Sequence, residues 1–163
     1  MSRARTSGVY VHIPFCASRC DYCDFATWTD RAHLIDKYVD ACVRDVEQRA
    51  LAPADTVFFG GGTPSLLEPA EAGRLIDACR SAYDVSPDAE ITLETNPETS
   101  SAARMEDFLR AGVTRVSFGA QSFDEAQLKR LGRIHPADRI GGAVREARAA
   151  GVDNVSLDLM FWL

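Results

Sequence analysis

Long apolar runs are missing from this sequence. No stretch approaches the roughly 20 consecutive apolar residues that a membrane-spanning helix needs, so no transmembrane segment is expected. The first residues include Arg3 and Arg5, but no apolar stretch of signal-peptide length follows them. We therefore expect a cytoplasmic protein.

Basic residues are scarce relative to acidic ones. The 163 residues contain 18 Lys and Arg against 24 Asp and Glu, which gives a net charge of -6 at pH 7. A negative net charge disfavours electrostatic binding to nucleic acid or to anionic lipid, so neither is an expected partner. Hydrophobic residues make up 46% and charged residues 26%, a composition typical of one globular domain of this length.

Cysteines are few, and their number is odd. Five cysteines without a secretion signal make a disulfide scaffold a poor interpretation. Three of them, Cys16, Cys20 and Cys23, lie within eight residues and are interpreted first as metal ligands. Cys42 and Cys79 lie on apolar faces of predicted helices and are interpreted as buried, inert thiols.

Strand-like and helix-like segments alternate along the chain. Runs rich in β-branched and aromatic residues predict strands over 8–13, 56–59, 91–95, 114–118 and 154–159. Apolar residues at helical spacing predict helices over 32–50, from 69 onward, over 101–110, from 122 to 132 and over 137–150. Ser122-x-x-Glu125 matches a capping box. The alternation requires parallel crossovers and therefore predicts an α/β sheet.

The predicted strands have one apolar and one polar face. In the first strand Val9 and Val11 share one face, and Tyr10 and His12 share the other. Only Phe58 breaks this pattern. A doubly wound sheet would be apolar on both faces, so the pattern favours a partial (β/α) barrel with helices outside. In such a barrel the chemistry lies where the strands end.

The spacing Cys16-x3-Cys20-x2-Cys23 allows one loop to surround a metal centre, because Pro14 prevents a helix there. On a four-iron cluster, three thiolates leave one iron free for another ligand, whereas electron-carrying clusters normally take four. Two alternatives stay open. The cysteines could be core residues on one helix face, or they could form a Cys3His zinc site with His12.

Six motifs resemble one enzyme family. The segment Tyr10-Val11-His12-Ile13-Pro14-Phe15-Cys16-x3-Cys20-x-Tyr22-Cys23 resembles the cluster loop of radical S-adenosylmethionine (SAM) enzymes, in the branch of oxygen-independent coproporphyrinogen III oxidases and HemW-type haem chaperones. The resemblance spans residues 8–160 through Gly60-Gly61-Gly62-Thr63-Pro64-Ser65, Glu94-Thr95-Asn96-Pro97, Ser117-Phe118-Gly119-Ala120-Gln121-Ser122-Phe123, Leu131-Gly132-Arg133-Ile134-His135 and Leu157-Asp158-Leu159-Met160.

The resemblance implies a [4Fe–4S] cluster on Cys16, Cys20 and Cys23, SAM bound beside it, and reductive cleavage of SAM. The oxidases of this branch carry a further cysteine two residues after the third, where this chain has Phe25. The segment Cys23-Asp24-Phe25 resembles the HemW-type pattern and favours haem handling over oxidative decarboxylation of a porphyrinogen. Haem or a porphyrin, and an electron donor protein such as a flavodoxin or a ferredoxin, are implied partners.

Polar residues at predicted strand ends are the candidate ligands of SAM. Three glycines end the second strand and would let a ligand approach the backbone, although a tight turn explains them equally well. No Gly-Lys-Ser/Thr follows, so this is not a phosphate loop. A barrel would also gather four polar side chains at one rim, those of Glu94, Gln121, Arg133 and Asp158. The resemblance assigns to SAM the residues Tyr10, Tyr22, Gly61, Gly62, Thr63, Glu94, Gln121, Arg133 and Asp158.

The four polar side chains at the strand ends also have ordinary structural interpretations. Glu94, Gln121, Arg133 and Asp158 would each, taken alone, fit a solvated side chain, a helix cap or an ion pair. No residue is assigned as catalytic. His33 and His135 are interpreted as surface or loop residues, and His12 as facing the barrel lumen.

The family continues beyond the last motif with further barrel elements and a C-terminal region for substrate or haem, whereas this chain reads Phe161-Trp162-Leu163. We therefore expect a tail over residues 1–7 and a radical SAM core over 8–163 that is truncated after about five strands, inactive alone and prone to associate. The haem site would lie outside this chain. Two alternative functions stay open: an oxygen-independent coproporphyrinogen III oxidase-like enzyme, and a metal-binding module without SAM chemistry.

Overall fold

The computed structural model describes residues 7–49 and 53–162. Its strands are β1 (Gly8–Ile13), β2 (Thr56–Gly61), β3 (Glu90–Thr95), β4 (Arg115–Gln121) and β5 (Asn154–Leu159). Its α-helices are α1 (Ile35–Gln48), α2 (Pro69–Tyr83), α3 (Ala102–Arg110), α4 (Glu125–Arg130) and α5 (Ala137–Ala149), and short 3-10 turns occupy Ala32–Leu34, Pro64–Leu66 and Pro97–Thr99. Residues 1–6 of the predicted tail, Ala50 and Leu163 lie outside the described residues.

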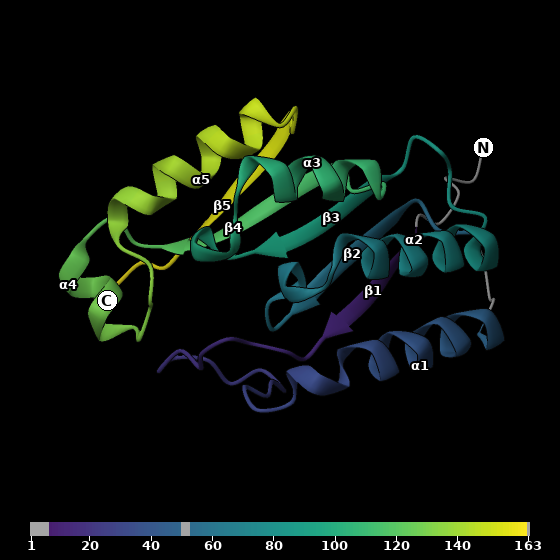
Figure 1. Ribbon diagram of the computed structural model, residues 1–163, viewed down its shortest axis with the longest axis horizontal. Helices are drawn as coiled ribbons and strands as arrows, with labels where there is room; N and C mark the ends of the chain where they lie inside the picture. Colours follow the sequence, from purple (N-terminus) through teal and green to yellow (C-terminus); the bar gives the residue numbers. More distant parts are fainter. Residues whose placement is uncertain (1–6, 50–52, 163) are drawn as a thin grey trace.

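The strands form one parallel sheet in the order β1-β2-β3-β4-β5. When every strand lies beside its predecessor, right-handed crossovers put all the connecting helices on the same face. Figure 1 shows this arrangement, with α1, α2, α3 and α5 side by side along one face and α4 beyond the end of β4. The sheet is not closed. The prediction of an α/β fold of partial-barrel type is confirmed.

The core lies between the sheet and this layer of helices. Each of the first four strands packs its predicted apolar side chains there, Val9 being only partly buried, which confirms the alternation for these strands. The strand contribution includes Val11, Ile13, Val57, Phe59, Ile91, Leu93, Val116 and Phe118. The helices contribute Leu75, Ile76, Met105, Phe108, Ala143 and Ala147. Burial of this apolar surface is the main force that holds the helices on the sheet.

The opposite face of the sheet, which we call the open face, carries the polar residues of the pattern. One row across it runs from Tyr10 through Phe58 and Thr92 to Arg115 by strand register. Phe58 breaks the polar pattern because it stacks on Tyr10, with ring centroids 6.1 Å apart and an interplanar angle of 21°. The open face is therefore aromatic at its β1–β2 edge and polar over β3 to β5.

Two strands run further than predicted. Gly60 and Gly61, expected in a loop, continue β2 because they pair with His12 and Ile13 of β1. Likewise β4 extends to Gln121, whose φ is 62°, and the β4–β5 register shifts between Phe118 and Gln121. Both extensions carry predicted site residues onto the rim of the sheet.

Helix starts were predicted with mixed success. Pro69 occupies the first turn of α2, and the side chain of Ser101 caps α3 by accepting the Arg104 N–H at 3.2 Å. The Ser122 capping box is wrong, because the cap of α4 is Asp124. Ser122 instead accepts the N–H of Asp124 in a turn after β4, which delays the helix by two residues.

No helix in the described ranges, 7–49 and 53–162, has the length and apolar character needed to cross a membrane.

Candidate functional site

A cavity of about 710 Å³, including the part open to solvent, lies at the carboxyl ends of the strands. Parallel strands bring these ends to one edge, the usual place for a ligand in such sheets. All three loop cysteines line it, as do eight of the nine residues assigned to SAM: Tyr22, Gly61, Gly62, Thr63, Glu94, Gln121, Arg133 and Asp158. The ninth, Tyr10, lies outside the lining, on the open face beside Phe58.

The cysteines lie on a loop without helical structure, so the alternative of a shared helix face is wrong. The loop leaves β1 at Pro14 and returns at Trp28. The Trp28 N–H donates to the Pro14 carbonyl at 2.8 Å, and the Cys16 N–H donates to the Trp28 carbonyl at 3.1 Å, which closes the base. All three thiols are free and partly exposed. This donor set, with a cavity beside it, fits a cluster held by three thiolates.

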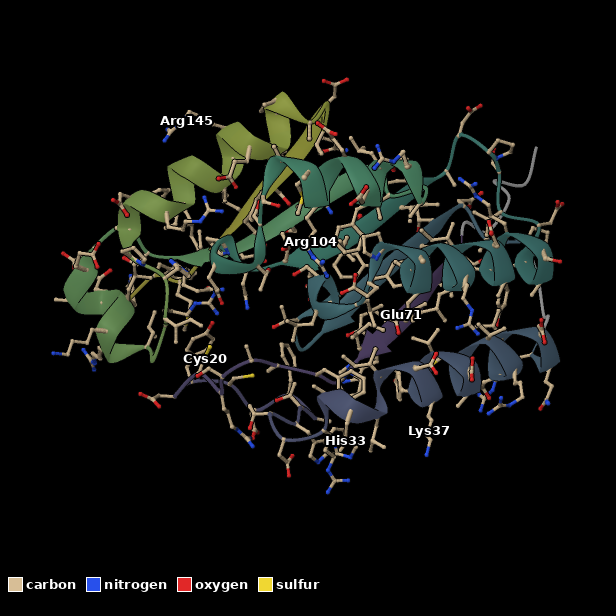
Figure 2. All side chains as sticks on the ribbon, in the orientation of Figure 1. Cys20, His33, Lys37, Glu71, Arg104 and Arg145 are labelled. Atoms are coloured by element: carbon tan, nitrogen blue, oxygen red, sulfur yellow. The ribbon has the colours of Figure 1, made fainter. Side chains whose placement is uncertain are left out.

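The far end of the cysteine loop rests on the segment between α4 and α5. The Asp21 N–H donates to the Leu131 carbonyl at 3.1 Å, and Arg133 Nη1 donates to the Cys20 sulfur at 3.3 Å. Gly132 has φ 70°, and a Cβ there would lie 3.1 Å from the Asp21 nitrogen. Figure 2 shows Cys20 beyond the end of the sheet in this region, whereas His33 and Lys37 point away from the sheet.

His12 does not complete a zinc site in this arrangement. Its Nδ1 lies 3.1 Å from the Tyr10 hydroxyl and its Nε2 lies 3.0 Å from the Ala26 carbonyl, so both ring nitrogens have partners. In the described parts of the chain, no three His, Cys, Asp or Glu side chains converge on a point where one metal ion would sit. A tetrahedral zinc site needs all its ligands within about 2.3 Å of the ion. The geometry therefore disfavours the Cys3His alternative.

The glycine triplet joins β2 to the base of the cysteine loop. The Gly62 N–H donates to the Ile13 carbonyl at 2.8 Å, and the Thr63 N–H donates to the Phe15 carbonyl at 2.7 Å. Gly61 has φ 111°, and a Cβ there would lie 2.5 Å from the His12 ring. The triplet thus serves the chain's own packing, and Gly61 and Gly62 also line the cavity.

Two carboxylates from different strands line the cavity. Glu94 accepts the Gly61 N–H at 3.1 Å, and Asp158 accepts the Ser117 hydroxyl at 3.0 Å. The pKa of Glu94 is raised above its ordinary value, mainly by burial and also by the charge of Asp158, while the hydrogen bond from Gly61 opposes the rise. The pair forms an acidic rim suited to hydroxyl or ammonium donors of a ligand.

Arg133 connects the cysteine loop to the ends of β3 and β4. Its Nη2 donates to Asn96 Oδ1 at 2.8 Å and to the Gly119 carbonyl at 2.7 Å, while Nη1 reaches Cys20. Its Nε donates to His135 Nε2 at 3.3 Å. A guanidinium carries five N–H donors, so these contacts occupy all but one. Arg133 therefore has an internal role in addition to lining the cavity.

His135 was predicted at the surface or in a loop, and the surface interpretation is wrong. It lies in the loop before α5, but only 3% of it is exposed. Burial lowers its pKa, as does the charge of Arg133. Because Nε2 accepts from Arg133, the neutral ring carries its proton on Nδ1, 3.3 Å from the Pro136 carbonyl. His33, by contrast, is exposed as predicted.

Sequence reasoning missed Asn96 as a site residue. It lines the cavity, where Nδ2 donates to Thr63 Oγ1 at 3.1 Å and Oδ1 accepts from Arg133. The available signal was its place directly after β3, the same rule that selected Glu94. Two aromatic residues of the cysteine loop also line the cavity, Tyr22 and Phe25, and burial raises the pKa of Tyr22 to about 12.

The two remaining cysteines lie in α1 and α2, away from the cavity. Burial raises the pKa of both Cys42 and Cys79, and that of Cys79 to about 11. Cys79 is fully buried, while Cys42 is only partly so. Burial also raises the pKa of the cavity cysteine Cys16, so the interpretation of Cys42 and Cys79 as inert rests on their places in helices outside the cavity lining.

Comparison with known families gives one match that covers nearly the whole chain. The sequence profile described as the radical SAM superfamily matches residues 10–162.

Individual relatives agree with this match. The haem chaperone HemW of Escherichia coli (strain K12) is 41% identical over 160 residues, covering 95% of this chain and 42% of the relative. The mitochondrial "Radical S-adenosyl methionine domain-containing protein 1" of Danio rerio is 37% identical and covers 99% of this chain and 37% of the relative. This chain thus spans about two fifths of the length of these curated relatives.

A solved structure shares the fold. The coproporphyrinogen III oxidase HemN from Escherichia coli, described as a radical SAM enzyme, superposes with a TM-score of 0.83 at 29% identity. The superposition covers 95% of this chain and 37% of that protein.

Proposed function

The chain belongs to the radical SAM superfamily, and on that basis we propose that it is the cluster- and SAM-binding part of a HemW-like haem chaperone. The observation that carries this proposal is the single cavity lined by the three loop cysteines and eight of the nine residues assigned to SAM. These residues come from six separate segments of the sequence. Their convergence supports a common ligand better than separate structural roles do.

The proposed roles follow the chemistry of each group. Cys16, Cys20 and Cys23 hold a [4Fe–4S] cluster, and the fourth iron binds SAM. The backbone of Gly61, Gly62 and Thr63 faces the methionine part of SAM, with Arg133 near its carboxylate. The acceptors Glu94, Gln121 and Asp158 receive its amino and hydroxyl donors, and Tyr22 lies beside the cluster, whereas Tyr10 lies outside the cavity lining and receives no ligand role.

When bound, the reduced cluster would supply one electron to the sulfonium of SAM and would itself be oxidised by one electron; the S–C5′ bond of SAM would break to give methionine and a 5′-deoxyadenosyl radical. The chain's own residues hold the cysteine loop in place and form the walls of the cavity. The contacts of Asp21 and Cys20 with the α4–α5 segment hold the cysteine loop over the strand ends. Tyr22 and Phe25, which are 38% and 63% exposed, form part of the cavity wall beside the cysteines.

A haem-chaperone role is favoured over a coproporphyrinogen oxidase role by two observations. Phe25 stands where the oxidases of this branch have a further cysteine. Identity to HemW of Escherichia coli is 41%, against 29% to HemN of the same species. We propose that haem or a porphyrin binds to parts of the protein outside this chain. A flavodoxin- or ferredoxin-like electron donor completes the proposed set of partners.

Cluster binding is tested by anaerobic reconstitution of the 163-residue chain, with iron and sulfide analysis and EPR of the reduced protein. We expect about four irons per chain, and an EPR signal that SAM perturbs. Cys20→Ala should lose most of the iron, while Cys79→Ala, a matched change of a buried helix cysteine, should keep it. Full iron content in Cys20→Ala, or a colourless zinc protein, would reject the proposal.

SAM binding is tested separately by calorimetric titration of the reconstituted chain. The Glu94→Gln and Asp158→Asn variants should each keep the iron. Their affinity for SAM should fall by roughly tenfold to a hundredfold, because a charge-assisted hydrogen bond contributes on the order of 1.5–3 kcal/mol. Glu106→Gln, the same change at an exposed position of α3, is the control. Unchanged SAM affinity in both test variants would refute the assignment.

A further inference from the structure

Four side chains on the open face form a continuous line of hydrogen bonds across β4 and β5. Arg115 Nη2 donates to Ser156 Oγ at 2.8 Å. Ser156 Oγ donates to Ser117 Oγ at 2.7 Å, and Ser117 Oγ donates to Asp158 Oδ1 at 3.0 Å. Asp158 lines the cavity, whereas the other three do not.

The two ends of this line fix the direction of every hydrogen bond in it. A guanidinium only donates, and a carboxylate only accepts. Ser156 therefore accepts from Arg115 and must turn its proton toward Ser117, and Ser117 must in turn donate to Asp158. Hydrogen bonds aligned in this way polarise one another, and those that end on charged groups are the stronger ones. A single arrangement of protons thus connects the cation to the cavity carboxylate.

Arg115 is itself held at the far end of the line. Its Nη1 donates to Thr92 Oγ1 of β3 at 3.2 Å and lies 3.9 Å from Glu90 Oε1. The hydroxyl of Thr92 also donates to Glu90, at 3.1 Å. Contacts on both neighbouring strands, β3 and β5, therefore restrict the guanidinium, although 24% of its side chain is exposed.

Asp158 depends on this line for its orientation. Ser117 and Ser156 lie opposite each other in the register of β4 and β5, but the register shifts beyond Phe118. Among the described residues, the hydroxyl of Ser117 is the group that donates a hydrogen bond to the Asp158 carboxylate. Asp158 is exposed on the edge strand β5, so packing does not fix its side chain. Without Ser117 the carboxylate would rotate among several rotamers.

We propose that Arg115 is a positioning residue that acts through Ser156 and Ser117 to hold the Asp158 carboxylate toward the cavity. This inference rests on the proposed function, in which Asp158 accepts hydrogen bonds from SAM. It assigns a binding contribution to three residues that do not touch the ligand. Arg115, Ser117 and Ser156 should therefore affect SAM affinity and leave cluster assembly unchanged.

The test is a set of calorimetric SAM titrations on the reconstituted chain, with iron content measured in parallel. Ser117→Ala and Arg115→Met should each lower the affinity for SAM about 3- to 10-fold, which corresponds to the free energy of one hydrogen bond. Ser117→Thr, which keeps the hydroxyl, should restore most of the affinity. The control is Arg110→Met, which removes an exposed guanidinium paired with Asp107 on α3 and should change nothing.

A double-mutant cycle separates positioning from general loss of structure. If Ser117 acts only through Asp158, Ser117→Ala in an Asp158→Ala background, where no side-chain acceptor is left at position 158, should weaken SAM binding no further. Additive losses would mean that Ser117 supports the fold, and would overturn the inference. Ser156→Ala repeats the test with a smaller change if Arg115→Met unfolds the chain.

Failure of the inference and failure of the proposed function give different results. If Asp158→Asn binds SAM as the wild type does, the assignment of Asp158 fails and the inference falls with it. If Asp158→Asn binds SAM weakly but Ser117→Ala and Arg115→Met bind it as the wild type does, the inference alone is wrong. A crystal structure of the Ser117→Ala variant tests the inference without SAM. The Asp158 carboxylate should move in that structure, and an unmoved carboxylate would refute the positioning role of Ser117.

Discussion

Substitution of Gly62 by alanine should disturb the junction between β2 and the cysteine loop. A Cβ on Gly62 would lie 2.5 Å from the Phe15 carbonyl oxygen, 2.9 Å from the Ile13 carbonyl oxygen and 3.0 Å from the Cys16 sulfur. Two of these three atoms belong to the backbone, so no side chain can rotate to relieve the contact. Either the chain compresses locally or the cysteine loop moves away from β2.

Both responses cost a similar free energy. Overpacking of a tight site costs about 1–3 kcal/mol. Separation would weaken two backbone hydrogen bonds, from Gly62 to Ile13 and from Thr63 to Phe15, at about 0.5–1.5 kcal/mol each. Either route destabilises the fold by about 2 kcal/mol. In a chain of this size, each 1 kcal/mol lowers the melting temperature by about 2–4 °C, so we expect a fall of about 4–8 °C.

The assay is thermal unfolding of the cluster-free chain, followed by iron analysis after anaerobic reconstitution. Gly62→Ala should melt earlier and take up less iron, because displacement of Cys16 separates the three thiols. Gly73→Ala in α2 is the matched control, since its new Cβ would lie 3.6 Å from Ala111, an ordinary contact. It should gain up to about 1 kcal/mol from helix propensity. A Gly62→Ala chain with wild-type melting and full iron would refute this reasoning.

Two further predictions concern stability. Burial lowers the folded-state pKa of His135 below its ordinary 6.5, so as pH falls through that value the unfolded chain takes up a proton that the folded chain does not, and the free energy of unfolding falls. His135→Gln should flatten this loss in urea titrations between pH 7 and 5, and an equally steep loss in the variant would contradict it. Leu93→Ala, at a fully buried position of β3, should lose about 2–5 kcal/mol. Leu159→Ala, at a position that is 57% exposed, should lose less than about 0.5 kcal/mol, and equal losses would show that the core is misassigned.

Much of the fold was predictable because its signals are local. Alternation of apolar and polar residues in the first strand, such as Val11 against His12, already indicated which face the helices cover. The same alternation excluded a doubly wound sheet. Phe58 was the exception, and its partner Tyr10 is 48 residues away in the sequence. Only the parallel register of β1 and β2 brings these two rings together.

The candidate site was predictable to the extent that motifs lie at strand ends. The spacing of Cys16, Cys20 and Cys23 and the polar residues Glu94 and Asp158 led to one rim of the sheet, and the cavity brings them together. The ligands of these residues stay predictions. Asn96 was missed because its role depends on Thr63 and Arg133, 33 and 37 residues away.

The sequence by itself determined the order of the elements, the buried face of the first four strands and the loop conformation of the cysteine segment, because backbone preference and side-chain alternation act between near neighbours. The tertiary structure alone decided that His135 is buried and that Arg133 contacts the Cys20 sulfur across 113 positions. It also decided that Arg115 reaches Asp158 through two serines. These contacts depend on strand register and on how the loops pack, and no local pattern in the sequence encodes them.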